Sequence, residues 1–270
     1  MSKKLDGGLD MKTYIIADLH GSFKPIRDFM QRLPQVNQDK MSNMIVLGDF
    51  GGNFFFDYRD DNYKKKLGTY PLTYFVIRGN HEERPSNCAK NNPDAWTKEK
   101  YFDGMVWVEK AYPYIKYAMD YPCWYTINGY KTLVIPGAYS VDKFYRLQNG
   151  WGWFMGEQLT EEEMKYGLEM IGCQDWKFDV VLSHTCPICY EPTDLFLPFI
   201  DQNMVEKTLE RYLDTIEHNL DYKLWLFGHY HTTRIYPNNG GKQMMMLFND
   251  KVIELEDWMS SLPLKVGTFI

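Results

Sequence analysis

Short apolar runs alternate with polar, helix-like stretches over the first third of the chain. The apolar runs have the length of buried strands and end in glycine or a polar residue. The predicted strands are Lys12–Ala17, Met44–Leu47 and Tyr74–Ile77. The stretches between them predict helices at Pro25–Leu33 and Asp57–Leu67. This alternation is typical of parallel strands joined by crossover helices.

The middle of the chain has a different pattern, because strand-like runs follow one another without intervening helices. The predicted strands are Met105–Val108, Ile115–Met119, Trp124–Ile127 and Thr132–Ile135. Between the last two lies Asn128-Gly129, a dipeptide that is strongly favoured in tight hairpin turns. We therefore expect an antiparallel hairpin here and a second sheet beside the first.

Helices and strands alternate again in the last third. Helices are predicted at Leu159–Ile171, where Thr160 and Glu163 have the spacing of a capping box, and at about Asn203–His218. The predicted strands are Val180–Leu182, Leu224–Phe227, Thr233–Tyr236 and Met244–Phe248. The segment Ser140–Trp153 lacks a clean periodic pattern, as long functional loops often do.

No internal repeat or linker divides the sequence, so we expect one domain that contains two sheets over residues 11–270. Residues 1–10 carry positive charge without the apolar core of a signal peptide, and we expect a disordered leader. No apolar run is long enough to span a bilayer. With 270 residues, of which 44% are hydrophobic and 24% charged, the chain buries a core without needing a disulfide or a structural metal.

Charge and cysteine content narrow the expected partners and compartment. The net charge of −6 and the lack of a basic block argue against bulk attraction to nucleic acid, although a local groove could still be positive. The five cysteines are scattered, which fits free thiols in a reducing compartment and predicts a cytoplasmic protein. Cys186 and Cys189 have the spacing of a redox pair or half a zinc site, but no second such pair exists.

Potential metal ligands gather at the ends of the predicted strands. Five of the six histidines follow a strand directly, namely His20, His81, His184, His229 and His231. Asp18, Asp49 and Asn80 occupy the same kind of position, whereas His218 lies on a polar helix and is interpreted as a surface residue. Because sites in open α/β sheets form at the carboxyl ends of strands, these donors are expected to meet at one edge.

Spacing supports this interpretation. Asp18 and His20, and likewise His229 and His231, are two residues apart, so each pair can face the same side of an extended segment. Glycine precedes three of the donors, at Gly48, Gly79 and Gly228, which suits backbone that turns beside a crowded site. Carboxylate, carboxamide and imidazole donors without thiolate suit manganese, iron or zinc. Each motif alone is common by chance, but five in order at strand ends predict a metal centre.

Together these motifs resemble the signature of the calcineurin-like metallophosphoesterases. The motifs are Asp18-x-His20, Gly48-Asp49, Gly79-Asn80-His81-Glu82, His184 and Gly228-His229-x-His231. The resemblance runs from residue 18 to 231, which is most of the chain. It implies an α/β fold, a four-layer α/β/β/α sandwich of two mixed β-sheets, with a dinuclear metal site at the strand ends.

The resemblance also implies a role for each motif. The first metal would be held by Asp18, His20, Asp49 and His231. The second would share Asp49 as a bridging ligand and take Asn80, His184 and His229. A hydroxide shared by the two divalent ions would attack phosphorus, and His81 would protonate the leaving group. Asn80 and His81 would contact the substrate, and Mn²⁺ is the first choice of metal for assays.

Details of the motifs separate branches of this superfamily. The run Arg78–Glu82 resembles the serine/threonine protein phosphatases, but Gly48–Asn53 lacks the second Asp and the Arg of that branch. The final Gly-His-x-His resembles phosphodiesterase-type members. Gly48–Gly52 and Gly137–Lys143 resemble small bacterial and phage-type metallophosphoesterases, whose substrates the resemblance does not supply.

Another residue must replace the missing phosphate contact. Arg78 is one candidate for a catalytic contact with phosphate, the alternative being that it braces a ligand loop. The other candidate is Ser140–Trp153, which we expect to form one wall of the substrate cleft, with Arg146 binding substrate. Trp151 and Trp153 of this segment either stack on a base or sugar, or pack over the core.

The expected function is hydrolysis of phosphomonoesters or phosphodiesters, with a small phosphorylated substrate such as a nucleotide or metabolite. A serine/threonine-type protein phosphatase and a non-catalytic metal-binding scaffold of the same fold are the alternatives. A scaffold should have lost ligands or the histidine of the Asn-His pair, and all of them are present here. The sequence leaves the oligomeric state open.

Overall fold

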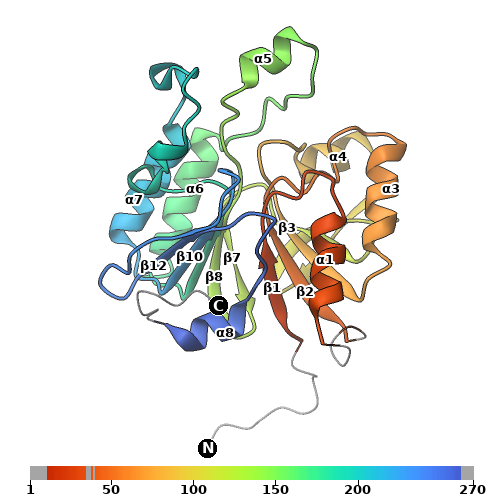
Figure 1. Ribbon diagram of the computed structural model, residues 1–270, viewed down its shortest axis with the longest axis horizontal. Coiled ribbons are helices and arrows are strands. Elements are labelled where there is room, and N and C mark those ends of the chain that lie inside the picture. Colours follow the sequence, from red (N-terminus) through yellow and green to blue (C-terminus); the bar gives the residue numbers. More distant parts are fainter. Residues whose placement is uncertain (1–10, 35–37, 39, 263–270) are drawn as a thin grey trace, which may run out of the picture.

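The computed structural model describes residues 11–34, 38 and 40–262. Two mixed β-sheets pack face to face, and helices cover the outer face of each (Figure 1). This arrangement is the four-layer α/β/β/α sandwich predicted from the sequence. The predicted leader, residues 1–10, lies outside the described residues.

The first sheet is built mainly from the N-terminal half of the chain. Its strand order is β13-β1-β2-β3-β6-β5-β4. The strands are β1 (Thr13–Ile16), β2 (Ser42–Leu47), β3 (Leu72–Ile77), β4 (Trp96–Tyr101), β5 (Gly104–Glu109), β6 (Ile115–Tyr117) and β13 (Ile253–Glu254). Parallel pairing joins β1, β2, β3 and β6, while the strands at both edges are antiparallel. Helices α1 (Lys24–Arg32), α3 (Tyr58–Leu67) and α4 (Pro85–Asn91) cover its outer face.

The second sheet follows in the chain and has the order β11-β12-β10-β9-β8-β7. Its strands are β7 (Cys123–Ile127), β8 (Tyr130–Ile135), β9 (Val180–Ser183), β10 (Leu224–Phe227), β11 (Arg234–Ile235) and β12 (Gln243–Met246). Strands β8, β9, β10 and β12 are parallel to one another. Helices α6 (Glu161–Gly172) and α7 (Thr208–Asn219) cover this sheet, and α8 (Leu255–Ser261) packs beside β1.

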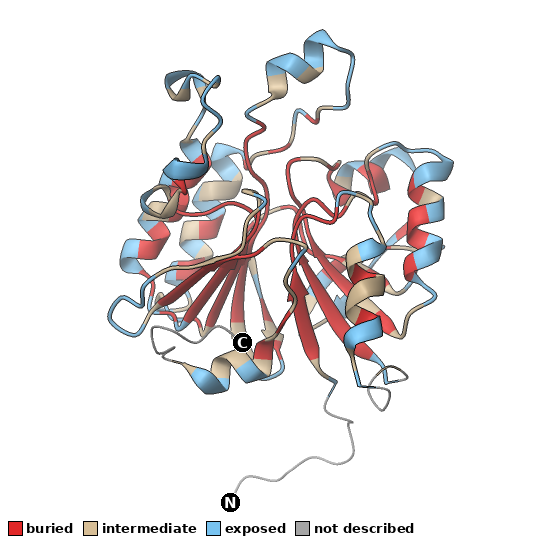
Figure 2. Ribbon diagram, in the orientation of Figure 1, coloured by how far each residue is buried: buried red, intermediate tan, exposed pale blue. Residues whose placement is uncertain are grey.

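Strand periodicity divides the apolar residues between an inner and two outer cores. In β1, Ile15 belongs to the core between the sheets, whereas Tyr14 and Ile16 belong to the core beneath the helices. In β9, Leu182 faces the inner core and Val181 faces α6 and α7. Because both faces of the central strands are covered, these strands are buried along their whole length (Figure 2).

Local sequence signals account for several boundaries. Asn128 and Gly129 both have positive φ, 48° and 83°, as the predicted hairpin turn between β7 and β8 requires. At the start of α6, the Thr160 side chain accepts from the Glu163 backbone N–H, and the Glu163 carboxylate accepts from Thr160, which confirms the capping box.

Two predicted segments differ from the structure. The helix expected from Asn203 begins only at Thr208, because Gln202–Met204 forms a separate 3-10 turn in which the Asp201 carboxylate accepts from Asn203. The segment Ser140–Trp153 contains a helix, α5 (Lys143–Gln148), instead of only a loop. None of the α5 residues is buried, so no apolar face was present to produce a periodic pattern.

Two exposed segments project beyond the sheets at one end of the molecule. One carries α5, and the other comprises the chain between β9 and α7 (Figure 1). Their outer parts contain mostly exposed and intermediate residues, in contrast to the buried strands below them (Figure 2). No helix in the described part of the chain combines the length and apolar character needed to cross a bilayer.

Candidate metal centre

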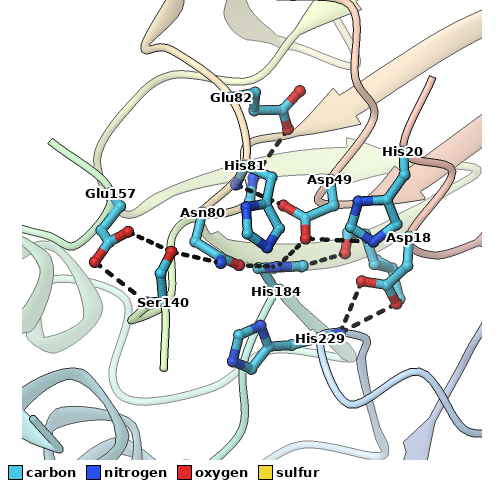
Figure 3. Close-up of polar contacts among 12 residues, drawn as sticks. Asp18, His20, Asp49, Asn80, His81, Glu82, Ser140, Glu157, His184 and His229 are labelled. Carbon is cyan, nitrogen blue, oxygen red and sulfur yellow. Dashed lines mark hydrogen bonds and ion pairs between the residues drawn. The ribbon is translucent and has the colours of Figure 1, made fainter. Parts of the chain in front are cut away.

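Seven potential ligands follow strands of both sheets, and six of them are labelled in Figure 3. Asp18 and His20 follow β1, Asp49 follows β2, Asn80 follows β3, His184 follows β9, and His229 and His231 follow β10. Four of them have ligand atoms that lie within 4.8 Å of one another, namely Asp18, His20, Asp49 and His231. This is the set that the sequence assigned to a first metal.

The remaining predicted ligands lie on the other side of Asp49. His184 Nε2 is 2.9 Å from Asn80 Oδ1 and 3.5 Å from Asp49 Oδ2. The rings of His184 and His229 have centroids 5.0 Å apart. The backbone N–H of His229 donates to both oxygens of Asp18 at 3.1 Å, which ties the two halves of the cluster together. Asp49 therefore lies between the two predicted ligand sets.

Hydrogen bonding shows that these side chains fit a cation. His184 Nδ1 lies 2.7 Å from the carbonyl oxygen of Leu47, to which it donates. The other nitrogen of the neutral ring then directs a lone pair toward Asn80 Oδ1 and Asp49 Oδ2, both of which are acceptors. Asp49 Oδ2 is buried and has no hydrogen-bond partner among the described residues. Electron-rich atoms that face one another in a buried space are the arrangement a divalent cation binds.

The charge states of the histidines agree with this fit. Burial lowers the pKa of His229 well below its usual value and lowers that of His231 to about 4, so both rings are neutral and keep a free lone pair. His184 differs, because the effect of burial is outweighed by Asp49 and Asp18, which raise its pKa to about 9. Without a metal, a proton therefore occupies the place between His184 and Asp49 that a cation would take.

The backbone of the centre is strained at five of the seven ligands. Positive φ angles occur at Asp18 (53°), His20 (47°), Asp49 (48°), His229 (72°) and His231 (51°). Residues other than glycine rarely adopt this left-handed conformation, which costs on the order of 1–3 kcal/mol at each position. The turns at the strand ends point side chains from different strands toward one location, so the strain coincides with the site.

Two of the predicted glycines are required by close packing on the ligands. A Cβ atom at Gly48, whose φ is +83°, would lie 2.0 Å from Nδ1 of His184. A Cβ atom at Gly79 would lie 2.1 Å from Oδ1 of Asp49. No side chain fits at either position without moving a ligand, as expected from their place before Asp49 and Asn80.

A hydrogen-bond chain that sequence reasoning missed fixes the orientation of Asn80 (Figure 3). Asn80 Nδ2 donates to Ser140 Oγ at 2.9 Å, and Ser140 Oγ donates to Glu157 Oε2 at 2.6 Å. Trp153 Nε1 donates to the same carboxylate oxygen at 2.8 Å. With its amide nitrogen engaged, Asn80 must direct Oδ1 toward His184. Ser140 belongs to the segment that resembles small family members, whereas no sequence pattern indicated Glu157.

His81 and Arg146 lie together at the edge of the ligand cluster. The backbone N–H of His81 donates to Asp49 Oδ1 at 2.9 Å. An Arg146 guanidinium nitrogen lies 3.5 Å from His81 Nε2, and Arg146 Nε donates to Asp142 at 2.8 Å. Both residues line a cavity of about 450 Å³ that also contains His20, Asp49 and His231. Part of the Ser140–Trp153 segment therefore lines the cavity at the cluster, and substrate binding by Arg146 stays a prediction.

Arg78 occupies a different place from the one expected of a phosphate contact. Its side chain is 2% exposed and donates to the carbonyl oxygens of Glu157 and Gly79 at 2.7 and 3.1 Å. Its Nε lies 3.8 Å from the buried Asp120 carboxylate. The guanidinium therefore braces the Asn80 loop against the segment that carries Glu157, and the predicted catalytic contact of Arg78 with phosphate is corrected.

Neither tryptophan of the Ser140–Trp153 segment lines the cavity at the ligand cluster. Trp153 bonds to Glu157 and lies beneath the Lys143 ammonium, which is 4.3 Å from the ring centroid. Trp151 packs edge-on against Tyr145, with ring centroids 5.4 Å apart. Trp153 thus matches the packing interpretation, whereas Trp151 is 55% exposed and packs on the exposed Tyr145, not over the core.

We expect Gly79→Ala to lower metal content, because its methyl group would displace the Asp49 carboxylate. Inductively coupled plasma mass spectrometry of the purified variant measures this. Gly172→Ala is the matched control, since its Cβ meets only Trp176 Nε1, at 3.8 Å, and its backbone does not have positive φ; it should retain wild-type metal content. Full metal occupancy in Gly79→Ala would show that the close approach does not constrain Asp49.

Ser140→Ala should weaken the binding of one of two metals by about 10–100-fold, the usual effect of removing a group that orients a ligand. Its loss leaves the Asn80 amide free to rotate. Calorimetric titration of the metal-free protein with Mn²⁺ would resolve the two affinities. Glu157→Gln, which keeps an acceptor for Ser140, should have the smaller effect. Equal affinities in wild type and Ser140→Ala would exclude a role for this chain in metal binding.

Comparisons with known proteins place this geometry in a family. Among solved structures, TT1561 of Thermus thermophilus matches with a TM-score of 0.52 and 11% identity, over 92% of this chain and 95% of that one. A dimetal phosphatase from Danio rerio matches with a TM-score of 0.47 and 10% identity, over 88% and 87% of the two chains. A search of curated proteins finds no significant match. The family model described as calcineurin-like phosphoesterase matches residues 11–233, and the chain belongs to this family.

Proposed function

We propose that this protein is a metal-dependent phosphoesterase that hydrolyses a small phosphomonoester or phosphodiester at the Asp49 cluster. Two divalent cations, manganese, iron or zinc, would be held by the seven ligands described above. The environment of Asp49 is the main observation in support of this proposal. Its carboxylate is buried between two sets of donors, and one of its oxygens has no hydrogen-bond partner among the described residues.

A pair of divalent cations supplies the positive charge that activates water at neutral pH and stabilises the developing oxyanions. The residues of this chain would supply substrate binding and proton transfer. Arg146 lies 3.5 Å from His81 and presents its guanidinium to the same cavity, where a phosphate oxygen could accept from it. His81 is the nearby imidazole that can donate a proton to the leaving oxygen.

Proton donation by His81 depends on the charges around its ring, and these change when a substrate binds. Burial lowers the pKa of His81, and the Arg146 charge adds to this, while Asp49 opposes it. A phosphate anion bound beside Arg146 would offset the guanidinium charge and raise the pKa toward its usual value. The proton donor would then form where a substrate is bound.

We expect the purified protein to hydrolyse p-nitrophenyl phosphate or its bis ester when Mn²⁺ is added, and to lose this activity after chelation. Release of p-nitrophenolate measures the rate. Asp49→Asn should reduce both metal content and rate, because the carboxylate lies between the two ligand sets. If neither ester is turned over with any of Mn²⁺, Fe²⁺ or Zn²⁺, the fold serves instead as a non-catalytic scaffold.

His81→Ala should slow hydrolysis of an alkyl ester by about 10²–10⁴-fold, the usual range for a lost general acid. The loss should be much smaller for p-nitrophenyl esters, whose leaving group needs no proton. Steady-state kinetics on both substrates measures the difference, and unchanged metal content shows that the centre is intact. An equal loss for both leaving groups would contradict proton donation by His81.

A further inference from the structure

The cavity at the metal ligands changes character along its length. Its inner end contains the histidines, Asp49 and Arg146 described above. Its outer part is lined by apolar side chains of the two projecting segments, including Val141, Leu195, Leu197, Ile200 and Val205. A molecule with its phosphate at the inner end must therefore direct its organic group between these segments.

A second cavity of about 520 Å³ extends the first one outward. The two cavities share six lining residues, Tyr139, Val141, Asp142, Leu197, Ile200 and Val205. The second adds Phe144 and Tyr145 from the α5 segment and Phe199 and Met204 from the segment before α7. We call this continuous space, from Val141 to Met204, the apolar groove.

Large apolar side chains around the groove are left exposed to solvent. Eight of those that the structure describes lie in residues 141–147 and 195–204, namely Val141, Phe144, Tyr145, Leu147, Leu195, Leu197, Phe199 and Met204. Phe199 and Met204 are 77% and 70% exposed. A contiguous apolar surface of this kind is unfavourable in water and usually marks a binding site.

Two ion pairs near the groove neutralise four of its charged side chains. Asp142 accepts from Arg146 at 2.8 Å, and Lys207 lies 2.6 Å from Glu191. The Asp201 carboxylate accepts from the backbone and side chain of Asn203. The groove thus offers its occupant hydrophobic contact, while the charge needed for a phosphate is concentrated at the inner end.

We propose that the apolar groove binds the organic group of the substrate, which is therefore an amphipathic phosphate ester with an alkyl or aryl body. This inference rests on the proposed function, because it places the phosphate at the Asp49 cluster. The groove and the metal cavity adjoin and share six lining residues, so a ligand held at the cluster can extend its organic group toward the groove. A polar sugar or nucleoside would leave the seven exposed apolar side chains that line the groove without an apolar ligand.

The test is a series of esters in which only the apolar body changes. Ethyl, butyl, hexyl and octyl phosphates have nearly equal leaving groups, and p-nitrophenyl esters of the same alkyl groups serve if the protein is a diesterase. All are used as monomers in solution. We expect kcat/KM to rise by about two- to fourfold for each methylene that enters the groove, as burial of apolar surface predicts. Naphthyl and phenyl phosphates provide the aryl arm.

Two variants test whether the gain in kcat/KM with chain length comes from contacts in the groove. The double variant Phe199→Ser, Met204→Ser should lose most of the gain with chain length, whereas Met155→Ser should keep it. Met155 is 88% exposed but does not line the groove, so it controls for the removal of an exposed methionine. A flat series in the wild-type protein overturns the proposal. An equal gain in wild type and the double variant overturns it as well, because the contacts would then lie elsewhere.

A binding measurement separates this inference from the proposed function. Alkylphosphonates of the same lengths are not hydrolysed, and calorimetry on the Mn²⁺-loaded protein gives their Kd. Affinity that rises with chain length supports the groove even if no ester is turned over, in which case only the hydrolytic function fails. If the affinity does not change from ethyl to octyl, the exposed apolar surface binds a different occupant. This result overturns the proposal that the groove binds the organic group of the substrate.

Discussion

The buried Asp49 carboxylate is the constraint around which the centre is organised. Removing a carboxylate from water costs several kcal/mol unless opposite charge and hydrogen bonds compensate. Burial alone would raise its pKa, but His184 and His81 hold that pKa well below the usual value, so the group stays ionised. One oxygen accepts from the His81 backbone, and the other faces the ligand imidazoles. The Asp49 carboxylate thus helps to position His20, His81 and His184.

Holding the ligands around this charge lowers the stability of the folded chain, because it requires strained backbone. Five left-handed residues, at on the order of 1–3 kcal/mol each, add strain comparable with the net stability of an ordinary domain. The strain persists because each turn is fixed by a strand buried on both faces and by backbone hydrogen bonds such as His20 N–H to Asp49 O, at 2.7 Å. The rigid sheets therefore offset the strain of the left-handed residues. A bound cation would also stabilise this backbone.

The sequence predicted those features that depend on local pattern. Donors at strand ends could be recognised because buried parallel strands are short apolar runs, and their ends share an edge. Strand β4 was not predicted, since Thr97–Lys100 is largely polar at the sheet edge and carries no apolar alternation. The orientation of the Arg78 side chain could not be predicted from the sequence either, because the Glu157 carbonyl that accepts from it lies 79 residues away along the chain. Glu157 itself is known as a partner of Ser140 only from the tertiary structure.

The segment from Tyr139 to Glu157 contributes both to the orientation of a predicted metal ligand and to the lining of the apolar groove. Ser140 orients a predicted metal ligand, and the next residue, Val141, lines the apolar groove. Neighbouring residues of this segment thus serve the two sites, since Ser140 bonds to Asn80 and Glu157 while Val141 lies among the groove residues. Groove residues such as Phe144 and Tyr145 can change without disturbing the hydrogen bonds that Ser140 and Glu157 make. The apolar side chains of the groove can thus vary while Ser140 and Glu157 preserve the geometry of the centre.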